Sequence, residues 1–172
     1  YQKAHGMRDP VEHCKGRIKS EDSMLEKFRK RGLDPTPENA FLTIHDAVGI
    51  RIVCSFVDDV YDLASLIRQI PDWTVLEEKD YIANPKPSGY RSYHMIIGMQ
   101  IHLPQESREL HAEIQIRTIA QDSWAALEHE LHYKHDIDNV ELIQQELRRC
   151  ADEMASTDLT LQTVRQMING EI

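Results

Sequence analysis

The sequence predicts an α+β domain in which a mixed β-sheet is flanked by helices and followed by a long C-terminal helix. Short β-rich apolar runs fill the middle of the chain, helical spacing of apolar residues dominates both ends, and one helical pattern separates the first two runs. The length of 172 residues fits one domain with enough core to fold alone.

A helix is expected near the start, from about Asp9 to Arg31, because apolar residues recur there at three- and four-residue spacing. Gly32, followed by Pro35 and Pro37, ends this helix. The apolar positions are Val11, Cys14, Ile18, Leu25 and Phe28.

The middle of the chain predicts three strands and a second helix. Ile50–Phe56 is β-rich and apolar, as in a central strand, and Asp58–Ile70 begins with two aspartates and carries an apolar helical face. Trp73–Ile82 and Tyr90–Leu103 are the next two strands. The prolines and glycine of Asn84–Gly89 mark the loop between them.

The fourth expected strand, Glu109–Ile119, alternates between apolar and polar residues, so its two faces differ. The apolar face comprises Leu110, Ala112, Ile114 and Ile116. The opposite face carries Glu113, Gln115 and Arg117. A strand with such a polar face either lies at a solvent edge or lines a site.

Two helices complete the prediction, at about Gln121–His135 and Asn139–Asn169. The last helix carries an apolar seam, interrupted at Thr157, that can pack either on the domain or on another subunit. We therefore expect a main part, residues 1–136, and a C-terminal helix of the same domain, residues 137–172, which is an oligomerisation element if its seam packs on another subunit. The seam comprises Val140, Ile143, Leu147, Cys150, Met154, Leu161, Val164 and Ile168.

The composition predicts a soluble cytoplasmic protein. Hydrophobic residues make up 41% and charged residues 28%, and no apolar run is long enough to cross a membrane. Cys14, Cys54 and Cys150 are far apart and form no C-x-x-C pair, which favours neither a zinc site nor a disulfide framework.

The net charge of −9 argues against a stable nucleic-acid partner, because such binding depends on neutralising phosphates. The positive charges nevertheless gather in two places, which suits a small polyphosphate ligand. The first cluster is Arg17, Lys19, Lys27, Arg29, Lys30 and Arg31, and the second is Lys79, Lys86 and Arg91.

Two early motifs carry candidate phosphate and metal groups. Within the expected helix, Lys19, Ser23 and Lys27 are four residues apart and share a face that can hold a triphosphate, although a solvated basic face is the plainer alternative. Asp46 precedes the first strand, where a carboxylate can hold Mg²⁺, and Gly49 allows close approach of a ligand. An acidic residue that merely caps the strand is the alternative for Asp46.

Two later motifs carry groups that can bind a purine base or take the proton of a substrate hydroxyl. Tyr90 follows the proline-stiffened loop and offers a flat face on which a purine can stack, and His94 lies on the same side of the strand. Glu113 can complete a Mg²⁺ site with Asp46 or accept a hydroxyl proton.

Taken in order, these motifs resemble the synthetase domain of the RelA/SpoT family, and most closely its small RelQ-type branch. The motifs are R-x-K-S-x-x-S-x-x-x-K from Arg17, D-x-x-G-x-R from Asp46, K-P-x-G-Y-R-S-x-H from Lys86 and E-x-Q-x-R from Glu113. The resemblance covers nearly the whole chain. It implies a nucleotidyltransferase-like fold and transfer of pyrophosphate from ATP to the 3′-hydroxyl of GDP or GTP.

The resemblance also implies a role for each motif residue. The implied ATP-binding residues are Arg17, Lys19, Ser23, Lys27 and Arg51, in which the two arginines sandwich the adenine. The implied Mg²⁺ ligands and catalytic residues are Asp46 and Glu113. The implied acceptor-binding residues are Lys79, Lys86, Tyr90, His94, Gln115 and Arg117. Members of the small branch are usually homotetramers, so this chain is expected to form one.

Two other functions stay open: a toxin-type relative that transfers pyrophosphate to tRNA, and a non-catalytic nucleotide sensor on the same fold. The negative charge and the Tyr90–His94 pair count against tRNA, and retention of both Asp46 and Glu113 counts against a sensor. Alarmone hydrolysis is not expected, because His45–Asp46 lacks the further His and Asp ligands on separate helices that this chemistry needs.

Overall fold

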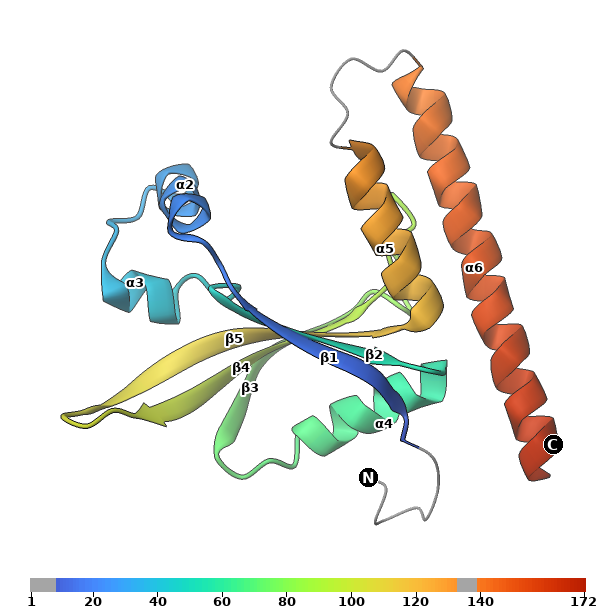
Figure 1. Cartoon of the computed structure of the whole chain (residues 1–172), viewed down its shortest axis with the longest axis horizontal. Coiled ribbons are helices and arrows are strands. Elements are labelled where there is room, and N and C mark those ends of the chain that lie inside the picture. Colours follow the sequence, from blue (N-terminus) through green and yellow to red (C-terminus); the bar gives the residue numbers. More distant parts are fainter. Residues whose placement is uncertain (1–8, 133–138) are drawn as a thin grey trace.

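A computed structural model describes residues 9–132 and 139–172 as one mixed sheet with helices around it (Figure 1). The strands are β1 (Val11–Ile18), β2 (Val48–Cys54), β3 (Trp73–Asp80), β4 (Tyr93–His102) and β5 (Ser107–Thr118). The helices are α2 (Glu21–Arg31), α3 (Pro37–Leu42), α4 (Val57–Ile67), α5 (Ile119–His132) and α6 (Val140–Asn169).

The five strands lie in the order β1-β2-β5-β4-β3. β2 and β5 pair in parallel, and the other three neighbouring pairs are antiparallel. This arrangement confirms the predicted mixed sheet and the long C-terminal helix.

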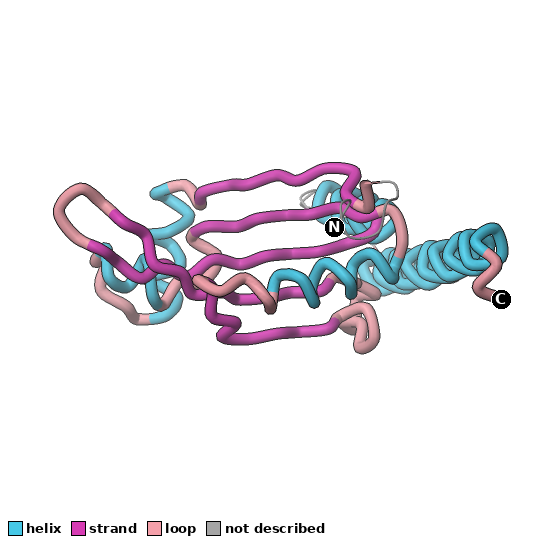
Figure 2. The backbone as a smooth tube through the Cα atoms, turned by 90° about the horizontal axis from the view of Figure 1, so that it is seen from below, coloured by secondary structure: helices cyan, strands magenta, loops and turns pink. Residues whose placement is uncertain are grey.

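One face of the sheet forms the main core against α4, which lies across the strands in Figure 2. The apolar residues of β5 that the alternation predicted to share a face, Ala112, Ile114 and Ile116, are buried here with Val60 and Ala64 of α4. The opposite face is bounded by α2 and α3 at one end and by α5 at the other (Figure 1). Because successive side chains of β5 alternate between faces, its polar side chains lie on the face of the sheet opposite α4.

The predicted helix from Asp9 to Arg31 is wrong in its first half, which forms strand β1. Val11–Ile18 pairs antiparallel with β2 along its length, and Ile18, placed in the helical stripe, is 82% exposed. The three-four spacing was therefore accidental, and pairing with the exposed edge of β2 outweighed it, since tertiary pairing overrides weak local preference. Ser20 then caps α2 by accepting a hydrogen bond from the Ser23 backbone N–H.

A short helix, α3, occupies a segment in which the sequence predicted only an end to helical structure. Thr36 accepts a hydrogen bond from the Asn39 backbone N–H, and Pro37 lies in the first turn, where its missing N–H is not needed. Behind α2 and α3, Phe28, Ile44 and Ala47 form a second, smaller core.

Helix α6 packs beside α5 through a face that is largely not the predicted apolar seam. Its buried residues are Ala151, Asp158 and Gln162, and the indole N–H of Trp124 in α5 donates to the Leu147 carbonyl at 2.9 Å. Much of the seam is exposed, namely Val140, Cys150, Leu161, Val164 and Ile168.

Predicted features that reach beyond His132 and before Asn139 lie outside the described residues, including the end of the Gln121–His135 helix and the boundary at residue 136. Among the residues that the structure describes, no helix is both long and apolar enough to span a membrane.

Candidate active site

The face of the sheet opposite α4 carries a row of polar side chains that crosses all five strands. Lys15 of β1 lies opposite Arg51 of β2, Arg51 opposite Gln115 of β5, Gln115 opposite His94 of β4, and His94 opposite Lys79 of β3. Paired residues on neighbouring strands point to the same face. The strand register therefore gathers residues from motifs that are far apart in the sequence.

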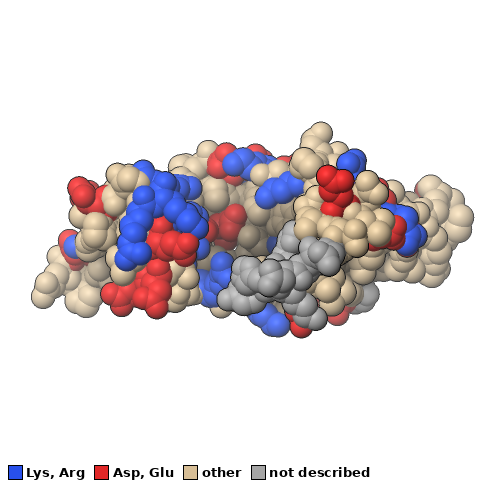
Figure 3. Space-filling view, turned by 90° about the horizontal axis from the view of Figure 1, so that it is seen from above, with Lys and Arg blue, Asp and Glu red and all other residues tan. Residues whose placement is uncertain are grey.

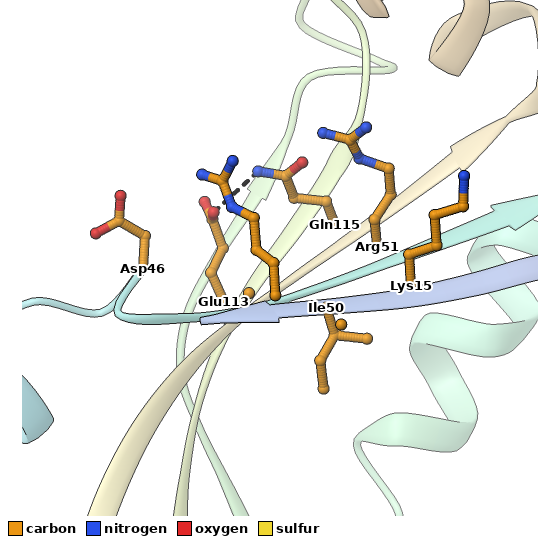
Figure 4. A pocket seen from close by; sticks show the side chains of 9 residues that line it. Lys15, Asp46, Ile50, Arg51, Glu113 and Gln115 are labelled. Atoms are coloured by element: carbon orange, nitrogen blue, oxygen red, sulfur yellow. Dashed lines mark hydrogen bonds between the residues drawn. The ribbon is translucent and has the colours of Figure 1, made fainter. Parts of the chain in front are cut away.

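A pocket of about 280 Å³ opens on this face above β1, β2 and β5. Figure 4 shows Asp46, Glu113, Gln115 and Arg51 on the same side of the sheet, with Ile50 pointing to the other side. Figure 3 looks down on this face, where Lys and Arg side chains surround a hollow with Asp and Glu side chains among them. The pocket is lined by Lys15, Gly16, Arg17, Asp46, Gly49, Ile50, Arg51, Glu113 and Gln115.

Asp46, just before β2, accepts hydrogen bonds from two lysines. Lys19 Nζ lies 3.0 Å from Oδ2 and Lys27 Nζ lies 2.5 Å from Oδ1. Burial raises the pKa of Asp46, but the hydrogen bonds from Lys27 and Lys19 outweigh it, so the pKa is lowered overall. Lys19 precedes the helix, so the predicted shared helical face with Ser23 is wrong, yet both lysines still converge on one carboxylate.

Glu113 of β5 is held by its two polar neighbours on the sheet. His94 Nδ1 lies 3.0 Å from Oε1, and Gln115 Nε2 donates to Oε2 at 2.9 Å. Burial raises the pKa of Glu113, while the hydrogen bonds from His94 and Gln115 lower it, and the net shift is downward. The negative charge of Asp46, which lines the same pocket, opposes that downward shift of the Glu113 pKa.

Tyr90 lies beside His94 of the row, and its hydroxyl contacts both that histidine and Arg117. Its hydroxyl is 2.8 Å from His94 Nε2 and accepts from Arg117 Nη2 at 2.5 Å. Lys86 Nζ lies 4.9 Å from the centroid of the Tyr90 ring and 4.7 Å from that of Tyr81. A purine that stacks on this side of Tyr90 would displace the Lys86 ammonium.

Asp122, in the first turn of α5, joins the two ends of the site. Its Oδ1 lies 3.1 Å from Arg117 Nη1 and 3.4 Å from Arg51 Nη1. Arg51 Nε is buried and has no hydrogen-bond partner among the described residues. A ligand acceptor atom at the pocket can supply that partner, which fits a binding role for Arg51.

The predicted site residues differ in how closely the structure brings them together. Arg17, Asp46, Arg51, Glu113 and Gln115 line one pocket. Lys19 and Lys27 bond to Asp46 and His94 bonds to Glu113, whereas the side chains of two predicted residues pair elsewhere. Those two are Ser23, exposed and bonded to Ser20 Oγ, and Lys79, which pairs with Glu77 at 2.7 Å on the edge strand.

Arg117 is 3% exposed, so its burial favours a supporting role over direct contact with a nucleotide. Sequence reasoning missed Asp122 and Tyr81 as members of this cluster. The only sequence signals for them are that Asp122 closely follows the E-x-Q-x-R motif and that Tyr81 closely precedes the proline loop. Their contacts depend on how α5 and the loop fold back over the sheet.

The pair Asp46 and Glu113 fits a Mg²⁺ ion. Mg²⁺ is typically held by one or two carboxylates together with substrate phosphates and water, rather than by an all-protein cage. Accordingly, the described residues contain no cluster of three or more His, Cys, Asp or Glu suited to a metal. The ion pairs with Lys19 and Lys27 show that the Asp46 carboxylate accommodates nearby positive charge.

Comparison with known proteins identifies relatives of the whole fold. The family model described as a region found in RelA/SpoT proteins matches residues 16–138. The GTP pyrophosphokinase YwaC of Bacillus subtilis (strain 168) is 42% identical over 152 residues, which cover 88% of this chain and 72% of that protein.

Solved structures agree with these sequence relatives. Small alarmone synthetase 1 from Bacillus subtilis, bound to its product pppGpp, superposes with a TM-score of 0.86 at 32% identity, over 97% of this chain and 84% of that one. Small alarmone synthetase 2 from Bacillus subtilis gives 0.85 at 38% identity, over 96% and 86%.

Proposed function

Because the chain belongs to the RelA/SpoT family, we infer that it is a GTP pyrophosphokinase that makes guanosine alarmones. The observation that carries this conclusion is that Asp46 and Glu113 line the same pocket as Arg17 of β1 and Arg51 of β2. Close similarity to small alarmone synthetases over almost the whole chain supports it.

The reaction moves a pyrophosphoryl group between two nucleotides. The 3′-hydroxyl oxygen of GDP or GTP attacks the β-phosphorus of ATP, and the bond from that phosphorus to the α–β bridging oxygen breaks. AMP leaves with the bond electrons, and the product is ppGpp or pppGpp. Glu113 is the proposed base that takes the hydroxyl proton, since its lowered pKa keeps the carboxylate ionised at neutral pH. Positioning and charge neutralisation supply most of the acceleration in such transfers.

We propose that ATP binds on the β1–β2 side of the pocket. Arg17 and Arg51 line it from adjacent strands and offer guanidinium planes to the adenine. Lys19 and Lys27 lie where they can move from Asp46 to the phosphates, and Ser23 in the first turn of α2 extends this cationic side.

The acceptor nucleotide is placed on the β4 side, over Tyr90. Its ring provides the stacking surface, His94 bridges the Tyr90 hydroxyl and Glu113, and Gln115 donates to the other oxygen of Glu113. Lys86, on the proline loop, is free to follow the acceptor phosphates because its side chain is held only by ring contacts with Tyr81 and Tyr90 among the described residues.

Mg²⁺ is the proposed metal, with Asp46 and Glu113 as its protein ligands. When bound, it would offset the negative charge that gathers on the phosphoryl oxygens during transfer. The lowered pKa of both carboxylates leaves them anionic and ready for such a cation near neutral pH.

We further propose a homotetramer, cytoplasmic location and no hydrolase activity. Exposed apolar side chains on the outer face of α6, among them Leu159, Val164, Met167 and Ile168, offer a subunit contact. A transferase acting on tRNA and a nucleotide sensor remain the alternative functions.

A turnover assay tests the proposed function. Purified protein is incubated with Mg²⁺, ATP labelled in the β-phosphate and GDP, GTP or GMP, and products are separated by ion exchange. We expect label in a guanosine polyphosphate with an equal amount of AMP. Label transferred only to tRNA, or ATP binding without product, would replace this function with one of the two alternatives.

A further inference from the structure

Two chains of hydrogen bonds run from the buried Arg117 to the two oxygens of Glu113. In the first, Arg117 Nη2 donates to Tyr90 Oη at 2.5 Å, Tyr90 Oη lies 2.8 Å from His94 Nε2, and His94 Nδ1 lies 3.0 Å from Glu113 Oε1. In the second, Arg117 Nη2 donates to Gln115 Oε1 and Gln115 Nε2 donates to Glu113 Oε2, both at 2.9 Å.

The Arg117 end of the first chain has a fixed direction, because a guanidinium can only donate and the Tyr90 oxygen must accept from it. Among the described residues, His94 Nε2 is the only acceptor within hydrogen-bond distance of the Tyr90 hydroxyl, so the Tyr90 proton points at that nitrogen. That nitrogen must then be the bare one, and the N–H of the neutral ring lies on Nδ1, facing Glu113.

The second chain has the same direction. The Arg117 guanidinium fixes the Gln115 carbonyl toward itself and so turns the amide N–H toward Glu113. Arg117 is itself anchored by Asp122 at 3.1 Å and by Ser92 Oγ at 3.3 Å. The carboxylate of Glu113 thus receives one donor on each oxygen from groups whose orientation begins at one buried cation.

We propose that Arg117 and the Tyr90 hydroxyl are positioning residues that fix His94 as its Nδ1–H tautomer and thereby orient the Glu113 carboxylate for the transfer reaction. This inference rests on the proposed function and adds a role for Tyr90 that is separate from base stacking. Stacking needs only the aromatic ring, whereas orientation needs only the hydroxyl. The two roles can therefore be separated by removing the oxygen alone.

The first test is Tyr90→Phe, which keeps the ring and removes the hydroxyl. We expect kcat to fall about 10-fold, as for loss of one well-placed hydrogen bond, with KM for GDP within about 2-fold of the wild-type value. Tyr61→Phe is the matched control, because it removes a 3.0 Å hydrogen bond to Asp80 outside the pocket. A raised KM with unchanged kcat would overturn the proposal, since the hydroxyl would then serve nucleotide binding.

The second test reads the tautomer of His94 directly, without turnover. Long-range ¹H–¹⁵N correlation spectra of ¹⁵N-histidine-labelled protein are recorded at about pH 8, above the usual histidine pKa of about 6.5. His94→Gln assigns the signal. We expect a protonated Nδ1 and a bare Nε2 in the wild type, and a mixed or Nε2–H ring in Tyr90→Phe. An Nε2–H ring in the wild type, or the same tautomer in both proteins, would overturn the proposal.

The two tests also separate this inference from the proposed function. If the wild type makes no alarmone, the proposed function fails, while the spectra still decide which tautomer the hydrogen-bond chain selects. If the wild type is active and the spectra show the other tautomer, only the positioning role is lost. Arg117→Lys, which keeps the charge but not the forked donors, should resemble Tyr90→Phe in its spectrum, and folding is checked by circular dichroism.

Discussion

Gly89 packs directly against Ala151 of α6, so closely that a Cβ added to Gly89 would lie 2.6 Å from the Ala151 Cβ. The φ of Gly89 is +92°, a left-handed backbone conformation that side chains rarely adopt. This contact fixes the loop before Tyr90 to the C-terminal helix. The position of Tyr90 therefore depends on α6 being docked.

Gly89→Ala should destabilise the protein by at least about 2 kcal/mol, from backbone strain and overpacking together. Thermal unfolding measures the loss. Gly16→Ala is the matched control, because a Cβ there meets no atom within 4 Å. Equal melting temperatures for the two variants would contradict the close packing of Gly89 on α6.

Asp158→Asn should make the stability of the protein less dependent on pH. Burial raises the pKa of Asp158, only partly offset by a hydrogen bond from Thr118, so the folded state disfavours the charged carboxylate. This penalty is absent below the unfolded-state pKa and is fully present above the raised folded-state pKa. The neutral amide avoids it.

We therefore expect Asp158→Asn to be as stable as the wild type or up to about 1 kcal/mol more stable at pH 7, with the gain vanishing toward pH 4. Urea unfolding at a series of pH values checks this. Asp72→Asn, at an exposed position, is the control. A gain that grows as the pH falls would show that the sign is wrong.

Tyr90→Ala should weaken acceptor binding by about 1–3 kcal/mol, the usual contribution of one base–aromatic contact, while ATP binding changes little. Calorimetric titration with GDP and with a non-hydrolysable ATP analogue separates the two. Equal losses for both nucleotides would show that Tyr90 supports the pocket as a whole and does not stack on the acceptor.

Arg17→Ala should have the converse effect. Arg17 lines the pocket beside Gly49, on the side where we place the adenine. Loss of a stacked guanidinium should raise the dissociation constant of the ATP analogue about 10- to 100-fold and leave GDP binding nearly unchanged. Arg108→Ala, on the exposed start of β5, serves as the control. Unchanged affinity for the analogue would exclude Arg17 from the donor site.

The sequence was sufficient to predict the polar face of β5 but not to predict β1. The alternation of β5 predicted correctly that Glu113, Gln115 and Arg117 oppose a buried apolar face, because a strand has only two faces. The early segment was predicted wrongly, because Val11, Cys14 and Ile18 fit helical spacing by accident and edge pairing with β2 leaves no comparable periodic signal.

The hydrogen bonds between the site residues could not be predicted from patterns in the sequence. Arg117 resembles any polar residue on the open face, yet it is buried, because α5 and the proline loop close over that end of the strand. Its contacts with Tyr90 and Asp122 depend on tertiary folding, which a pattern along one strand does not encode. The motif order identified the family, and the register of five strands explains why those motifs meet.

The most direct test of the central claim compares Glu113→Gln with the wild type in a single-turnover reaction, with nucleotide binding measured in parallel. Gln keeps the size of the side chain and removes its charge and basicity. We predict that ATP and GDP bind within a few-fold of the wild type, while the rate of label transfer falls by about 10²–10⁴-fold. Transfer at a near-normal rate, or a loss fully explained by weaker binding, would contradict the assignment of this pocket as the site of pyrophosphate transfer.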